Sequence, residues 1–237
     1  MKLSAPVYRL RRTARLLSRE RNIPLNRALD EIARQEGYKN WSLLAARLWA
    51  ETPAARLFGQ LRQGDLLLVG ARPNQGKTLL GLELALEAIK SGAKGKFFSL
   101  EYAKRDMQDC LNAIAADRGK LGGMFEFDGS DAISADYLIA ALASAPRGTL
   151  VVIDYLQLLD QRRDRPALVA QVKALKAFAS ERGLILVFLS QIDRSYDASE
   201  KPCPGLDDVR LPNPLDLTLF NKACFLNNGT INFQTVH

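Results

Sequence analysis

Short runs of consecutive apolar residues alternate with longer stretches of helical periodicity over most of the chain. The runs at 66–69, 150–153 and 184–189 are wholly apolar, that at 96–100 includes Lys96 and Ser99, and that at 124–127 is a weaker strand because it includes Glu126. The helical patterns between them lie at 79–89, 106–116, 134–144 and 166–181. A strand that is buried on both faces reads as a continuous apolar run, because neither face meets water. The order therefore predicts an α/β fold, with a mostly parallel sheet and helices on both faces.

The end of the chain has a different pattern. Residues 217–220 and 231–233 look like strands, and the turn Asn227-Asn228-Gly229 lies between them. Turns of this composition are typical of two antiparallel strands in a hairpin. We expect an antiparallel hairpin at the edge of the sheet.

Residues 1–50 have helical rather than strand periodicity. The apolar faces of the first two predicted helices are formed by Leu10, Ala14 and Leu17, and by Leu25, Leu29, Ile32 and Ala33. Pro24 would open the second helix and Gly37 would end it. A third helix is marked by Trp41, Leu44, Ala45 and Leu48. We expect three short helices around Trp41, separate from a main domain at 51–237.

Basic residues concentrate in the same segment. Residues 1–50 hold 11 Lys and Arg against 4 Asp and Glu, which leaves 22 basic and 22 acidic residues for the rest of the chain. Arginine-rich helices are attracted to phosphates, so nucleic acid is one expected partner. The alternatives are a protein partner, or a solvated basic face that packs on the main domain or on a neighbouring subunit.

Composition excludes several classes of protein. The apolar fraction of 47% is that of a globular protein, and no run reaches the roughly 18 apolar residues that a membrane span needs. The first residues lack the apolar stretch of a secretory signal. The three cysteines are far apart and the only histidine is terminal, so no metal-ligand set is present. We expect a cytoplasmic protein without membrane contact.

The apolar run at 66–69 leads into a loop of the form A-x-x-x-x-G-K-T, and a helical run follows. Strand, loop and helix in this order are typical of a phosphate-binding loop. Lys77 would supply a point charge for the β- and γ-phosphates, and the Thr78 hydroxyl would bind Mg²⁺. The residues expected around ATP are Arg72, Pro73, Asn74, Gln75, Gly76, Lys77, Thr78 and Leu79. The alternative is an ordinary turn with a surface lysine.

Polar residues also stand at the ends of three other predicted strands. Glu101, Asp154 and Gln191 follow the runs at 96–100, 150–153 and 184–189. Ligands of open parallel sheets bind beyond the carboxyl ends of the strands. Asp154 would hold Mg²⁺ and Glu101 would polarise the attacking water as general base. The alternatives are a helix N-cap for Asp154 and an exposed charge for Glu101. Gln191 would sense the γ-phosphate or position water by hydrogen bonding.

Four segments together resemble the motor domain of the DnaB-type replicative helicases. They are 70–78, 97–101, 152–159 and 189–191, and the likeness covers about residues 55–237. The resemblance implies the RecA-like fold, with Lys77 and Thr78 on the nucleotide and magnesium and Asp154 as the Walker B carboxylate. It also implies Glu101 as the catalytic carboxylate and Gln191 as the residue that couples hydrolysis to DNA.

The family resemblance further implies a ring or hexamer whose central channel holds single-stranded DNA, faced by the segment from Ile192 onward. In such rings a neighbour's Lys and Arg reach the γ-phosphate. Here Lys222 would match the Lys, but Cys224 stands where the Arg would be, and no arginine follows Arg210. Either Arg210 or Arg194 substitutes, or hydrolysis is slow, or the protein is not a processive motor. Residues 1–50 do not resemble the helical domain of these helicases.

Three functions are therefore compatible with the sequence. The first is a DNA-stimulated ATPase that acts as a small DNA helicase. The second is a regulatory ATPase that recruits a partner through residues 1–50 without unwinding DNA. The third is a kinase for a small substrate, since the same loop also serves phosphoryl transfer.

Overall fold

The computed structural model describes residues 7–44, 52–114, 123–160, 165–199, 201–211 and 213–236. The chain divides into two compact units, Met1–Arg56 and Leu57–His237. The expected boundary after residue 50 stays a prediction.

The first unit contains the helices α1 (Val7–Glu20) and α2 (Leu25–Gln35). Their facing sides meet in a small core of Leu10, Ala14, Ala28 and Ile32, and the partly buried Trp41 packs against it. Alanine at two of these four positions lets the helices approach closely. Residues 41–44 are helical, whereas the expected continuation through Ala45 and Leu48 lies outside the described residues.

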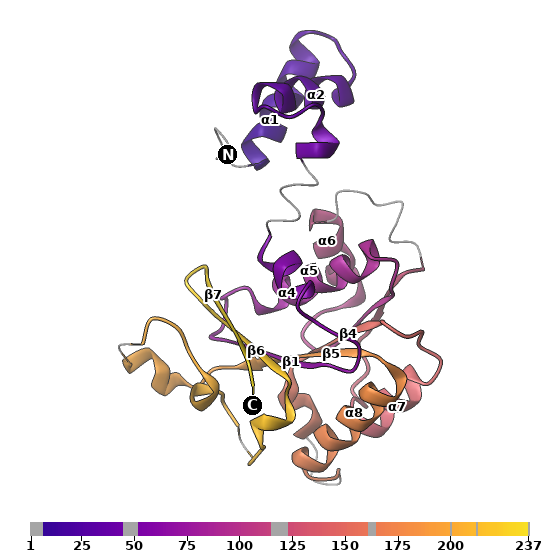
Figure 1. The fold of residues 1–237 in the computed structure, drawn as a ribbon, viewed down its shortest axis with the longest axis vertical. Coiled ribbons are helices and arrows are strands. Elements are labelled where there is room, and N and C mark those ends of the chain that lie inside the picture. Colours follow the sequence, from indigo (N-terminus) through magenta and orange to yellow (C-terminus); the bar gives the residue numbers. More distant parts are fainter. Residues whose placement is uncertain are drawn as a thin grey trace. The chain divides into compact units, whose positions relative to one another are not determined.

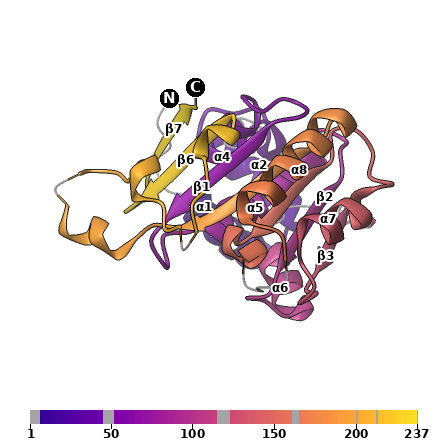
Figure 2. The ribbon, with the colours of Figure 1, turned by 90° about the horizontal axis from the view of Figure 1, so that it is seen from below.

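The second unit is built on a seven-stranded sheet with the strand order β3-β2-β4-β5-β1-β6-β7. The strands are β1 (Leu66–Ala71), β2 (Gly95–Ser99), β3 (Phe125–Asp128), β4 (Leu150–Asp154), β5 (Ile185–Gln191), β6 (Lys222–Asn227) and β7 (Thr230–Thr235). All neighbouring pairs are parallel except the last, in which β7 runs antiparallel to β6. Figure 2 shows β3 and the β6–β7 hairpin at opposite sides of the sheet.

The helices of this unit cover both faces of the sheet, as the apolar runs predicted. These helices are α5 (Lys77–Lys90), α6 (Lys104–Ile114), α7 (Ala135–Leu142) and α8 (Leu168–Arg182). Figure 1 shows α5 and α6 on one side and α7 and α8 on the other. The short helix α4 (Pro53–Phe58) spans the boundary between the two units. Ser134 caps α7 by accepting a hydrogen bond from the Tyr137 amide. In the part of the chain that the structure describes, no helix has the length and apolar content to cross a membrane.

One expected strand is a short helix instead. Residues 217–219 form a 3₁₀ helix, because the Asp216 side chain accepts a hydrogen bond from the Thr218 amide and caps the turn. The hairpin therefore begins at Lys222, and its first strand continues the parallel sheet beside β1. The expected end of α6 at Ala116 falls beyond the described residues.

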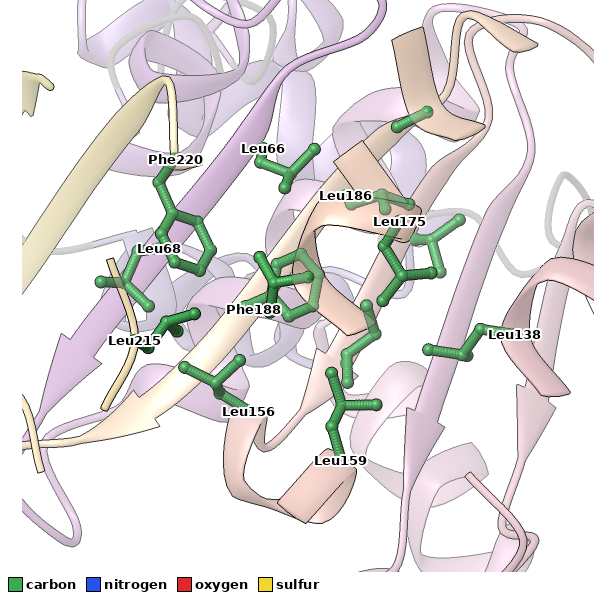
Figure 3. Close-up of a cluster of buried hydrophobic side chains, with 14 of the residues drawn as sticks. Leu66, Leu68, Leu138, Leu156, Leu159, Leu175, Leu186, Phe188, Leu215 and Phe220 are labelled. Atoms are coloured by element: carbon green, nitrogen blue, oxygen red, sulfur yellow. The ribbon is translucent and has the colours of Figure 1, made fainter. Parts of the chain in front are cut away.

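The largest core lies between the sheet and the α7–α8 face. Side chains from alternate positions of β1, β4 and β5 point into it, including Leu66, Leu68 and Phe188 (Figure 3). Phe220, just before β6, is fully buried there and meets Phe188 edge to face with ring centroids 5.5 Å apart. This contact joins the hairpin to the centre of the sheet.

We expect Phe220→Ala to destabilise the second unit by about 3–5 kcal/mol, because it removes a buried ring and leaves a cavity. Urea unfolding followed by far-UV circular dichroism measures this change. Both tryptophans, Trp41 and Trp49, precede residue 57, so tryptophan fluorescence reports on the first unit and should not change. Leu100→Ala, at a side chain that is 38% exposed, is the control. A destabilisation below about 1 kcal/mol for Phe220→Ala would contradict the packing.

Candidate active site

Four parallel strands end at the same edge of the sheet. The register pairs Ala71 with Gln191, Asp154 with Leu189, and Ser99 with Asp154. The chain segments that follow β1, β2, β4 and β5 therefore emerge side by side. This is the edge at which open parallel sheets bind ligands.

The loop after β1 has the backbone conformation of an anion-binding loop. Asn74 and Gly76 have positive φ angles of 62° and 85°. Glycine adopts such a φ without strain, and no atom lies within 4 Å of the place where a Cβ of Gly76 would stand. α5 begins directly afterwards, and its N-cap Gly76 offers no side-chain hydrogen bond. The first amides of α5 and its dipole therefore face the loop, an arrangement that favours a bound anion.

Two loop side chains are held by other segments rather than directed into the loop. The Arg72 guanidinium pairs with both carboxylate oxygens of Asp197, at 2.8 and 2.7 Å, and donates to the Ile192 carbonyl at 3.1 Å. Gln75 Oε1 accepts a hydrogen bond from the Asn228 amide in the β6–β7 turn at 2.7 Å. The loop is thus tied to the segment after β5 and to the hairpin.

The remaining loop residues differ in exposure. Lys77 is buried, with 8% of its surface exposed, whereas Leu79 is 47% exposed. Pro73, Asn74 and Gly76 are exposed. Pro73 and Leu79 have no polar side-chain atom, so any contact with a phosphate would involve their backbone.

The first turn of α5 reaches across β5 to the end of β4. Thr78 Oγ1 donates a hydrogen bond to Asp154 Oδ2 at 3.0 Å, although β5 lies between β1 and β4 in the sheet. Gly81, one turn later on the same face of α5, permits this close approach. A Cβ at Gly81 would stand 3.0 Å from Val152 Cγ1 and 3.4 Å from Leu189 Cδ1. Glycine inside a helix costs about 1 kcal/mol relative to alanine, so its presence here is consistent with a packing requirement.

Asp154 is a buried carboxylate with incomplete hydrogen bonding. Its side chain has no exposed surface, and Oδ1 has no hydrogen-bond partner among the residues that the structure describes. Burial, together with the nearby Glu101 charge, raises the pKa of Asp154 to about 6, although Lys77 and the Thr78 hydroxyl oppose the shift. Losing water without gaining partners disfavours the charged form of a carboxylate. A cation beside Oδ1 would reverse that penalty.

These oxygens fit a magnesium ion that arrives with a nucleotide. Carboxylate and hydroxyl oxygens suit a hard cation, and Mg²⁺ is commonly bound by one or two protein groups together with phosphate oxygens. Among the described residues, no group of three or more His, Cys, Asp or Glu side chains could hold a metal ion. Thr78 and Asp154 alone would supply too few ligands, so phosphate and water oxygens would have to complete the set.

Glu101 and Gln191 lie at the same edge but make different contacts. Glu101 is exposed just after β2, and its amide donates to Ser99 Oγ at 3.1 Å. Its charge acts on Asp154, which places the two carboxylates near each other. Gln191 ends β5 beside Ala71, and its backbone carbonyl accepts from the Arg210 amide at 2.8 Å. The structure thus brings Lys77, Thr78, Glu101, Asp154 and Gln191 to one edge.

Sequence reasoning missed four residues that shape this edge. They are Gly81, Ser99, Asp197 and Asn228. A glycine inside a helical pattern is a recognisable signal of close packing, so Gly81 could have been found. Asp197 and Asn228 contact the loop only because the segment after β5 and the hairpin flank β1, and that strand order is not visible in the sequence.

Lys222 and Cys224 occupy the two positions that the family resemblance assigns to a neighbour's nucleotide, and both are held within their own chain. Lys222 lies at the start of β6 and forms an ion pair with Asp65, just before β1. This is the opposite end of β1 from the phosphate loop. Cys224 is fully buried, and burial raises the pKa of its thiol to about 12. Arg194 and Arg210 are exposed at the edge that carries the loop.

Comparisons with known proteins point to one family. Residues 131–213 match the DnaB-like helicase C terminal domain. The replicative DNA helicase DnaB of Mycoplasma pneumoniae is 25% identical over 213 residues, which cover 71% of this chain and 44% of that protein. The corresponding helicase of Leifsonia xyli is 27% identical over 214 residues, covering 77% and 46%. The chain thus spans less than half the length of these curated relatives.

Solved structures show the same fold. A DnaB-like replicative helicase, described together with its interactions with primase, aligns with a TM-score of 0.55 and 22% identity over 69% of this chain and 47% of its own. An ATPase domain aligns with a TM-score of 0.57 and 19% identity over 79% of this chain and 81% of its own. From about residue 55 onward, the chain is similar in sequence to the motor domain of the DnaB-type replicative helicases and has its RecA-like fold.

Proposed function

We propose that this protein binds and hydrolyses ATP with Mg²⁺ and uses the reaction on DNA, as a DNA helicase. The single observation that supports this most strongly is the contact of Thr78 with Asp154 at 3.0 Å, directly beside the loop that carries Lys77. The buried carboxylate there keeps one oxygen without a partner. A structural N-cap would instead have its acceptor satisfied by the backbone.

The proposed roles in nucleotide binding follow from burial and charge. Lys77 would place its ammonium group against the β- and γ-phosphates, and the amides from Asn74 to Lys77 would bind phosphate oxygens. Thr78 and Asp154 would hold Mg²⁺ together with phosphate oxygens. When bound, the ion would neutralise charge on the transferred phosphoryl group.

Glu101 is the proposed general base. It is exposed just after β2, and its charge contributes to the raised pKa of Asp154, which supports a place near the proposed metal site. A carboxylate there would accept a proton from the attacking water. Gln191 is the proposed link to DNA, because it ends β5 and its carbonyl holds Arg210 in the following segment.

Single-stranded DNA is the proposed partner of the segment after β5. Ile192 and Val209 form an antiparallel bridge that closes this segment at its base. Arg194 and Arg210 are exposed on it, and exposed arginines suit a strand of phosphates. The ion pair between Arg72 and Asp197 connects it to the phosphate loop.

We further propose that copies of the chain assemble into a ring. A helicase of this kind encloses the strand on which it moves, and a ring also lets one copy contact the nucleotide of the next. The support for this assembly is the similarity to the DnaB-type replicative helicases.

A second candidate function is a regulatory ATPase that recruits a partner through residues 1–50 and does not unwind DNA. The specific observation in its favour is that Lys222 is paired with Asp65 and that Cys224 is buried. Lys222 would have to leave Asp65, and Cys224 would have to leave the core, before either could contact a neighbour's nucleotide. An arginine finger contributes about 10³–10⁵ in rate where one is used, so its absence would slow hydrolysis.

We expect Glu101→Gln to bind ATP normally and to hydrolyse it about 10²–10⁴-fold more slowly, because only the base is removed. Lys77→Ala should abolish nucleotide binding and serves as the reference for a loop that no longer binds phosphate. Fluorescent-nucleotide binding and phosphate release measure the two steps. Glu181→Gln, at an exposed glutamate on α8, is the matched control. Turnover at the normal rate in Glu101→Gln would show that another carboxylate is the base.

We expect single-stranded DNA to raise the rate of ATP hydrolysis at low salt, because the segment that would contact DNA is bonded to the phosphate loop. The assay is phosphate release with and without an oligothymidylate, on protein shown to be folded by circular dichroism. Unwinding of a forked duplex in the same preparation separates the two functions. Stimulation with unwinding supports the helicase, whereas hydrolysis without either response supports the regulatory ATPase.

A further inference from the structure

The solvent face of α1 is a stripe of arginines. Arg12, Arg15 and Arg19 are all exposed. At helical spacing they fall within an arc of about 60°, opposite the side that buries Leu10 and Ala14. They extend about 10 Å along the helix axis. Among the residues that the structure describes, none of the three forms an ion pair.

The acidic residues nearby do not neutralise this stripe. On α2, Glu31 forms an ion pair with Arg21 at 2.7 Å, and Asp30 accepts a hydrogen bond from the Trp41 amide at 2.8 Å. Both carboxylates are therefore used within the first unit. Glu20 follows Arg19 directly, but a step of one residue turns it by about 100° away from the stripe.

We propose that α1 binds the phosphate backbone of duplex DNA through Arg12, Arg15 and Arg19. Guanidinium groups form paired hydrogen bonds with phosphate oxygens, and a row of three along one helix face matches a row of phosphates. The binding would be independent of sequence, because phosphates carry no base information. It does not depend on the nucleotide site.

Two other kinds of partner fit the surface less well. A helix that lies on a membrane needs a free apolar face, but the apolar face of α1 is already buried against α2. A protein interface has an apolar centre with a polar rim. Among the side chains of α1 whose exposure the structure describes, Leu16 is the one large apolar side chain near the arginines, and it is 56% exposed.

Duplex DNA is also favoured over single-stranded nucleic acid. Proteins that hold single strands stack the bases on aromatic side chains. Among the side chains of α1 whose exposure the structure describes, none is aromatic, and Trp41 packs against the core of the first unit. The described part of this surface can neutralise phosphates but offers no platform for unpaired bases.

The test is binding of the full chain, without nucleotide, to a fluorescein-labelled blunt duplex, followed by anisotropy across a salt series. The variant Arg12→Gln/Arg15→Gln/Arg19→Gln should bind at least about tenfold more weakly at low salt. The slope of log K against log salt should fall in magnitude by about 3, one for each arginine that no longer neutralises a phosphate. The substitutions lie on the exposed face, so the helix content measured by circular dichroism should not change.

Two further variants make the result specific. Arg12→Lys/Arg15→Lys/Arg19→Lys keeps the charge and should keep most of the salt slope. Lys104→Gln/Arg105→Gln/Lys173→Gln removes the same charge at exposed positions of the second unit and should bind the duplex as the unmodified protein does. The basal ATPase rate should be the same in all of them.

Several results would overturn the proposal. They are an unmodified protein that does not bind the duplex, a glutamine variant that binds it normally, or an equal weakening in the second-unit control. Binding to vesicles of anionic lipid with none to the duplex would assign the stripe to a membrane surface instead. Absence of ATP hydrolysis in the unmodified protein would refute the proposed function but leave this result unaffected.

Discussion

The hydrogen bond from Thr78 to Asp154 connects the two halves of the candidate site, and the rest of the arrangement depends on it. Thr78 belongs to the helix that follows the phosphate loop, and Asp154 ends a strand two positions away in the sheet. The contact exists because α5 crosses β5 closely. Gly81 allows this approach because it has no side chain. A larger residue at position 81 would push the helix outward and separate the two oxygen atoms.

Because Asp154 is buried, this contact favours a bound cation. A carboxylate without exposed surface and with one unpaired oxygen is unfavourable unless something compensates its charge. Lys77 and the Thr78 hydroxyl compensate in part, while Glu101 adds repulsion. The two carboxylates at the ends of β2 and β4 outnumber Lys77 at the start of α5, which leaves a negative charge for a divalent cation to balance. The same cation would bring in the phosphates that the loop is shaped to hold.

The elements of the second unit could be predicted well from the sequence, because strands buried on both faces are visible as apolar runs and each ends in a polar residue. Asp154, Glu101 and Gln191 could be placed at one edge for that reason alone. The segments that flank the loop could not be predicted. The pairing of Arg72 with Asp197 depends on β5 lying beside β1, and that of Gln75 with Asn228 depends on β6 lying beside β1 on the other side. The ion pair of Lys222 was missed for the same reason, since its partner Asp65 is distant in sequence.

The most direct test of this arrangement is a crystal structure of the protein with Mg²⁺ and a non-hydrolysable ATP analogue. We expect the triphosphate in the loop from Arg72 to Thr78, with Lys77 on its phosphates and the ion bound at Thr78 Oγ1 and near Asp154. An analogue bound elsewhere, or a loop that holds phosphates while Asp154 and Glu101 point away from the ion, would contradict it.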